Sequence, residues 1–114
     1  MKIKTPLWAA GTLLFALAGM SPAHAAVDAA QAQALMKSNK CEKCHAVDKD
    51  KTGPALKKIA AKYKGKAEGE ANIIKNITTG PKIKNDDGTE EEHKIIKSKD
   101  QAELKNLAQW ILSQ

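Results

Sequence analysis

The residues whose types and spacing could carry chemistry are two cysteines and a histidine in the segment Cys41-Glu42-Lys43-Cys44-His45. The C-x-x-C spacing places two thiols on one side of a helical turn, and a histidine follows immediately. Such thiols can add to the two vinyl groups of a porphyrin, while the imidazole binds the iron through Nε2. The segment therefore predicts one covalently attached haem c, held by Cys41, Cys44 and His45.

Two other uses of this cysteine pair fit the sequence less well. A thioredoxin-like redox pair needs a βαβ context, whereas the sequence on both sides of Cys41 and Cys44 has helical periodicity. A zinc site would have to include His45 and His93, which are too far apart for zinc-finger spacing. The histidine directly after the second cysteine favours haem over both.

The first 25 residues have the pattern of a secretory signal peptide. Lys2 and Lys4 form a basic start, an apolar stretch runs from Leu7 to Met20, and Ala23-His24-Ala25 matches a small-x-small cleavage site. Retention as a membrane anchor is the alternative, but the stretch is short for a span of about 20 residues. We expect cleavage after Ala25 and a soluble periplasmic domain over residues 26–114, without stable membrane insertion.

The elements that must position these residues belong to one small domain. The chain has 114 residues, of which 42% are hydrophobic, 28% charged and 4% aromatic. Beyond residue 25, Trp110 and Tyr63 are the only aromatic residues other than histidine. A small domain buries a modest fraction of its surface and needs bulky groups to build a core. A large cofactor would fill the interior that the side chains leave open.

The periodicity of apolar residues predicts four helices and no internal repeat. Asp28 can cap a first helix that runs to Ser38, and Ser98 with Gln101 forms an S-x-x-Q capping box before a C-terminal amphipathic helix. The remaining helices are expected over residues 55–64 and over residues 68–79, the latter ended by Gly80-Pro81. Strands are not required, although Asp87-Gly88 could close a short hairpin within residues 81–97.

The sequence resembles the small class I c-type cytochromes across nearly all of residues 26–114. The resemblance rests on Leu35-Met36 before the haem motif, on Gly53-Pro54-Ala55-Leu56, and on the terminal segment 107–112. It implies an all-α fold of about four short helices around one haem, and an electron carrier rather than an enzyme. It also implies that the Pro54 carbonyl accepts a hydrogen bond from His45 and that Trp110 belongs to the haem-binding residues.

One departure from the family pattern concerns the sixth iron ligand. Class I members usually supply a methionine from the loop before the last helix, but this chain has no methionine after Met36. Met36 lies on the proximal side and is expected in the core. His93 lies in the relevant loop, so we expect it to be the sixth ligand. Lys82, Asn85 and an open five-coordinate iron are the alternatives.

Charge patterning bears on the partners. All 19 basic residues are lysine, the net charge is +6, and several lysines surround the haem motif in sequence: Lys37, Lys40, Lys43, Lys49, Lys51, Lys57 and Lys58. Complementary charge raises association rates more than affinity. We expect a monomer that meets redox partners transiently through their acidic surfaces, and no nucleic-acid binding. An acidic run between Asp86 and Glu92 is most simply a solvated loop.

Two classes of function follow from the choice of sixth ligand. With His45 and His93 both bound, the iron is closed to substrates, and the haem cycles between Fe(II) and Fe(III) as a carrier of low to middling potential. With an open or displaceable sixth position, the protein would instead bind or react with a small ligand. A haem subunit of a larger complex is a third possibility. The absence of arginine and of further histidines offers little support for peroxide chemistry.

Overall fold

The computed structural model describes residues 2, 26–85 and 87–114. Within these residues the chain forms four α-helices, one 3-10 turn and a two-stranded antiparallel hairpin. This agrees with the predicted all-α class. Apart from Lys2, the predicted signal peptide lies outside the described residues. No helix among the described residues is both long enough and apolar enough to cross a membrane.

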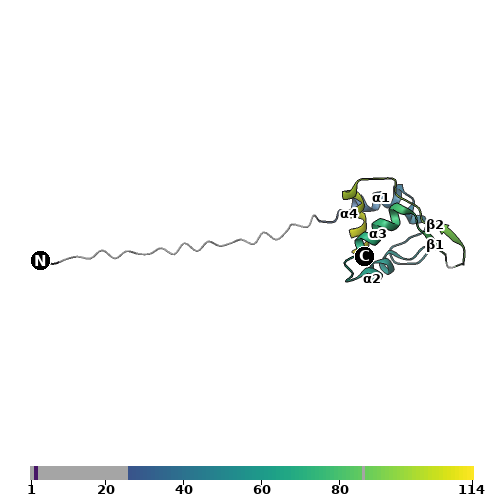
Figure 1. The fold of residues 1–114 in the computed structure, drawn as a ribbon, viewed down its shortest axis with the longest axis horizontal. Helices are drawn as coiled ribbons and strands as arrows, with labels where there is room; N and C mark the ends of the chain where they lie inside the picture. The colour runs from purple at the N-terminus through teal and green to yellow at the C-terminus, as the bar shows by residue number, and fades with distance from the viewer. Residues whose placement is uncertain (1, 3–25, 86) are drawn as a thin grey trace.

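Helices α1 (Ala29–Ser38) and α4 (Gln101–Leu112) pack against each other and bring the two ends of the domain together (Figure 1). As predicted, Asp28 caps α1, because its side chain accepts a hydrogen bond from the Gln31 backbone N–H at 3.0 Å. Asn106 of α4 forms two hydrogen bonds with the backbone of Asp28 at the start of α1. Its Oδ1 accepts from the Asp28 N–H, and its Nδ2 donates to the Asp28 carbonyl, both at 2.8 Å. The start of α1 is therefore tied to the middle of α4.

Helices α2 (Leu56–Tyr63) and α3 (Gly69–Thr79) also pack on α4, which is consequently the central element. Leu104 and Leu107 of α4 are each only 1% exposed. Met36 is buried, as expected from the sequence. The core contains aliphatic side chains and a single tryptophan: Ala32, Leu35, Met36, Leu56, Ile73, Ile77, Ile96, Leu104, Leu107, Ala108, Trp110 and Ile111.

The predicted capping box at Ser98 is wrong. Helix α4 begins at Gln101, and Asp100 is its cap, accepting from the backbone N–H groups of Ala102 and Glu103 at 3.0 and 3.4 Å. Ser98 instead donates its hydroxyl to the Glu103 carboxylate at 2.6 Å. An ionised carboxylate is a strong acceptor at the positive end of a helix, and Asp100 stands directly before the first helical residue.

The hairpin that Asp87-Gly88 allowed is present. Strands β1 (Lys82–Lys84) and β2 (Glu90–Glu92) pair antiparallel with Lys82 opposite Glu92, and they extend away from the helices (Figure 1). Gly88 has a φ of +86°, which a turn of this kind requires and which glycine adopts without strain. The hairpin joins the end of α3 to the segment that leads into α4.

Candidate functional site

The cysteines lie in a tight turn directly after α1. Lys40 adopts a left-handed φ of +59°, which redirects the chain into the 3-10 turn Cys41–Lys43. The carbonyl of Cys41 then accepts from the backbone N–H groups of Cys44 and His45 at 3.1 and 3.0 Å. Both cysteines are half-buried, they form no disulfide with each other, and both border the same cavity. The spacing argument for two thiols on one side of a turn thus agrees with the structure.

A cavity of about 550 Å³ opens between the helices and the hairpin. It is bordered by Cys41, Cys44, His45 and His93, and apolar side chains from several elements complete its wall: Met36, Ile59, Tyr63, Ile73, Ile77, Ile83, Ile96, Leu107 and Ile111. A mostly apolar hollow of a few hundred cubic ångströms with a few polar groups is typical of a cofactor site. The donor set and the apolar wall fit a haem attached through the two thiols.

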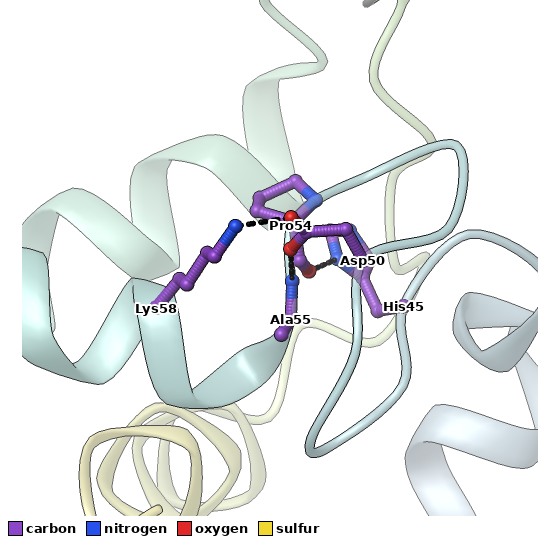
Figure 2. Close-up of polar contacts among 5 residues, drawn as sticks. All are labelled: His45, Asp50, Pro54, Ala55 and Lys58. Carbon is purple, nitrogen blue, oxygen red and sulfur yellow. Dashed lines mark hydrogen bonds and ion pairs between the residues drawn. The ribbon is translucent and has the colours of Figure 1, made fainter.

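The His45 ring is oriented by the loop that follows it. Its Nδ1 donates to the Pro54 carbonyl at 2.7 Å, so the hydrogen bond implied by the family resemblance is present (Figure 2). This bond holds the proton on Nδ1 and leaves Nε2 free for a metal, as metal-bound histidines generally require. Gly53 makes room for the ring, because a Cβ at residue 53 would lie 2.6 Å from His45 Cε1.

The loop is itself attached to the start of α2. The residue before α2, Ala55, has no side chain that could cap the helix. The backbone N–H groups of residues 55–57 nevertheless all have acceptors in the segment after His45. Ala55 donates to Asp50 Oδ1 at 2.8 Å, Leu56 to the Ala46 carbonyl at 2.9 Å, and Lys57 to the Val47 carbonyl at 3.1 Å. The haem-motif loop therefore caps α2.

His93 reaches the same cavity from the end of the hairpin. Lys82 and Glu92 are the last paired residues of the two strands, and the next pair outward is Pro81 and His93. The His93 N–H donates to the Pro81 carbonyl at 2.9 Å. The His93 Nδ1 lies 2.8 Å from the Lys94 carbonyl and can donate to it, which leaves Nε2 free, as in His45. Each histidine thus has a backbone carbonyl on Nδ1 and an unused Nε2.

The two imidazole rings lie close together, and both border the large cavity. Their centroids are 6.1 Å apart and their planes meet at 43°. A metal–imidazole bond is about 2 Å long, so two imidazoles on opposite sides of one metal ion have centroids roughly 6 Å apart. The observed spacing of His45 and His93 fits an iron between them.

The segment around His93 is fixed by the end of α3. Ile96 donates to the Ile77 carbonyl at 2.7 Å, and Gly80 ends α3 with a φ of +61°. A Cβ at Gly80 would lie 2.9 Å from the His93 carbonyl oxygen and 3.0 Å from Ile95 Cγ2. Gly80 is therefore both a helix terminator and the point where α3 and the His93 segment come closest.

Burial acts on two groups of the site. It lowers the pKa of His45, which favours the neutral imidazole, the form that binds a metal. The Pro54 hydrogen bond opposes this shift, and nearby His93 adds to it. Burial also raises the pKa of the Cys41 thiol, which means that the surroundings of this side chain disfavour the charged thiolate.

Three of the other candidates lie in different places. Trp110 is buried and does not border the large cavity; it borders a second, smaller hollow of about 250 Å³ together with Met36, His45 and Leu56. Asn85 lines the large cavity, but its side-chain amide donates to Thr89 Oγ1 and Glu91 Oε1 within the hairpin. Lys82 is exposed and outside the cavity wall. Among the proposed sixth ligands, His93 is the one whose ring lies close to His45.

Two features of the site, Asp50 and the role of Gly80, were not predicted from the sequence. Asp50 is one charge among many in a lysine-rich loop, and its contacts with Ala55 and Lys58 become visible only in the fold. Gly80 is recognisable in the sequence as a helix stop, but its contact with the His93 segment depends on the fold.

The comparisons with known proteins agree with this geometry. A family model described as Cytochrome c matches residues 29–114. Cytochrome c-551 of Stutzerimonas stutzeri is 40% identical over 121 aligned residues, covering 98% of this chain and 96% of that protein. The crystal structure of Class 1 cytochrome MtoD from Sideroxydans lithotrophicus ES-1 superposes with a TM-score of 0.74 at 53% identity, covering 77% of this chain and 97% of that one.

A second solved structure, the wild-type cytochrome c552 of Nitrosomonas europaea, has a TM-score of 0.58 and 33% identity. The match covers 71% of this chain and 96% of that one. Both solved structures are therefore matched over nearly their whole length.

Proposed function

This chain belongs to the cytochrome c family and is a monohaem electron carrier, and we propose that it works in the periplasm with His45 and His93 as the two axial ligands of its iron. Cys41 and Cys44 would hold the haem c through thioethers. The haem supplies a one-electron couple between Fe(II) and Fe(III). The protein residues bind it, orient it and keep water away from it.

The observation that carries the ligand assignment is the 6.1 Å separation of two imidazole rings that both border the cavity. Each ring has its Nδ1 against a backbone carbonyl, Pro54 for His45 and Lys94 for His93, which leaves Nε2 as the nitrogen that can bind a metal. A hydrogen bond on the outer nitrogen makes an imidazole a better ligand and sets its orientation. A pair of imidazoles favours ferric iron more than a histidine–methionine pair does, so the potential should be lower than in methionine-ligated relatives.

The role of carrier, and not of enzyme, follows from a filled sixth position. If His45 and His93 both hold the iron, a substrate could not reach it, and the haem would supply electron transfer without bond chemistry on a substrate. The border of the cavity carries more basic than acidic side chains: the exposed lysines are Lys40, Lys58, Lys62, Lys84 and Lys94, and the exposed glutamates are Glu91 and Glu92. We assign to this rim the transient docking of partners with acidic surfaces, by a monomeric domain of residues 26–114.

The ligand assignment is tested on the haem-loaded protein from a bacterium that attaches haem c. Intact mass is expected to show one haem on a chain that begins at residue 26. Optical and EPR spectra should be those of six-coordinate low-spin ferric haem, and the ferrous protein should bind carbon monoxide poorly at neutral pH. Rapid binding of carbon monoxide would overturn the assignment and favour a small-ligand haem protein.

The docking assignment is tested by salt and charge reversal. Electron exchange with an acidic redox protein should slow as ionic strength rises, because salt screens exposed charges. Lys84→Glu, at the rim, should slow the reaction at low salt more than Lys66→Glu, an exposed lysine outside the cavity wall. Equal effects of both variants, or a rate independent of salt, would contradict docking through the rim.

A further inference from the structure

The peptide group between Pro54 and Ala55 is held at both of its polar ends. Its carbonyl accepts from His45 Nδ1 at 2.7 Å, and its N–H donates to Asp50 Oδ1 at 2.8 Å (Figure 2). A peptide group is planar, with the N–H and C=O pointing in opposite directions. An acceptor that fixes the direction of the N–H therefore fixes the direction in which the carbonyl meets His45.

Asp50 is in turn held by an ion pair. Its second carboxylate oxygen, Oδ2, pairs with Nζ of Lys58, which lies in the first turn of α2 (Figure 2). The backbone of Asp50 also forms an isolated antiparallel bridge with His45. The Lys58 hydrogen bond, followed by the Ala55 N–H, lowers the pKa of Asp50. A charged carboxylate is thus fixed between a helix and the loop that carries the Pro54 carbonyl.

We propose that Asp50 is a positioning residue for His45, acting through the Pro54–Ala55 peptide, with Lys58 as the group that holds its carboxylate in place. The proposal rests on the proposed function in one respect, since it takes His45 as an iron ligand. A carboxylate that accepts from a peptide N–H polarises that peptide and makes its carbonyl a stronger acceptor. His45 then donates its Nδ1 proton more strongly and becomes a more electron-rich ligand.

The direction of the effect follows from this chain of contacts. An electron-rich imidazole stabilises ferric iron, so Asp50 lowers the reduction potential. Loss of the acceptor should raise the potential and loosen the His45 Nδ1 proton. The negative charge of Asp50 would favour ferric iron in the same direction through space, so a charge-matched control is needed.

The chain supplies that control in Asp48. It lies two residues from Asp50 in the same exposed loop and pairs with Lys57, the neighbour of Lys58. The N–H of the Pro54–Ala55 peptide donates to Asp50 and not to Asp48. Asp48→Ala and Asp48→Asn therefore remove the same charge from nearly the same place without releasing the peptide.

The experiment measures the midpoint potential of haem-loaded Asp50→Ala, Asp50→Asn, Asp48→Ala and Asp48→Asn by redox titration. Asp50→Ala is expected to shift the ferric–ferrous equilibrium about threefold further toward ferrous iron than Asp48→Ala does, which is about 28 mV at 59 mV per tenfold for one electron. Asp50→Asn keeps an oxygen that can accept from Ala55. Its midpoint potential should therefore exceed that of Asp48→Asn by less than Asp50→Ala exceeds Asp48→Ala, but in the same direction.

A second readout reports on the histidine itself. In the ¹⁵N-labelled ferrous protein, the His45 Nδ1 proton should exchange with solvent faster in Asp50→Ala than in the wild type or in Asp48→Ala. A residue that only stabilised the loop would change the melting temperature without this pattern. If Asp50→Ala does not fold and take up haem, the comparison of Asp50→Asn with Asp48→Asn tests the proposal by itself.

Equal potentials and equal exchange rates in the Asp50 and Asp48 variants would overturn the proposal. This failure differs from a failure of the proposed function. If His45 were not an iron ligand, the wild-type protein itself would lack the expected haem mass and low-spin spectrum. A properly loaded wild type with indistinguishable variants contradicts only the role of Asp50.

Discussion

The imidazole rings of His45 and His93 lie close together, with their centroids 6.1 Å apart. Yet the two residues reach this point from unrelated elements, one from the turn after α1 and the other from the end of a hairpin. Both rings have a backbone carbonyl against Nδ1, so protein contacts alone orient each ring. The two proposed ligands are therefore held in place independently of each other.

Replacement of His93 should change the iron environment without loss of haem attachment. His93→Ala would remove the proposed sixth ligand, so the ferric spectrum should shift toward high spin, and the ferrous protein should bind carbon monoxide. His93→Met should raise the midpoint potential, because thioether ligation favours ferrous iron. Lys82→Ala and Asn85→Ala are the controls and should keep the wild-type spectrum. An unchanged spectrum in His93→Ala would exclude His93 as the ligand.

Gly80→Ala should disturb the His93 segment. An alanine there meets the His93 carbonyl oxygen at 2.9 Å and must also adopt a φ of +61°. Gly65→Ala is a matched control, because Gly65 has a φ of +72° and a Cβ added there would have no atom within 4 Å. Denaturant unfolding should show a loss about 1 kcal/mol larger for Gly80→Ala than for Gly65→Ala.

The same pair of variants separates stability from ligation. If Gly80 positions His93, then carbon monoxide should bind faster to ferrous Gly80→Ala than to Gly65→Ala. Identical unfolding free energies and identical carbon monoxide rates would show that the close approach at Gly80 has no consequence.

Leu104→Ala should weaken the fold while leaving the haem environment intact. Leu104 is 1% exposed in the core and does not border the large cavity. Truncation of a buried leucine costs about 2–5 kcal/mol, to be measured by denaturant unfolding of the haem-loaded protein. Leu107→Ala removes an equally buried side chain that does border the cavity. It should therefore also alter the haem absorption spectrum, and an altered spectrum in Leu104→Ala would contradict this division.

The Asp50 carboxyl should titrate below the ordinary range for aspartate. The Lys58 hydrogen bond and then the Ala55 N–H lower its pKa in the folded state. A pKa lower in the folded than in the unfolded chain means that the carboxylate stabilises the fold above the unfolded pKa, and that this contribution disappears as the pH falls through the folded pKa. Carboxyl-carbon NMR should show the low midpoint, and Lys58→Met should move it upward. A midpoint unaffected by Lys58→Met would exclude the ion pair as the main cause.

The amino-acid sequence by itself determined the haem attachment segment, because a cysteine pair followed by histidine is a local pattern whose chemistry depends only on spacing. It also determined the helices, since the apolar periodicity of α1 to α4 and the Asp28 cap are local features. The one wrong cap, Ser98, arose because two residues with capping side chains stand close together, and only their geometry shows that Asp100 precedes the first helical residue.

The tertiary structure alone decided how distant residues meet. That His93 lies close to His45 depends on the hairpin register and on the contact at Gly80, neither of which has a signature in a charged loop. Likewise, Asp50 acquires its place beside the Pro54–Ala55 peptide only when α2 packs back on the haem-motif loop. Long-range contacts of this kind depend on how whole helices and strands pack together, whereas the spacing of residues within one segment can be read directly from the sequence.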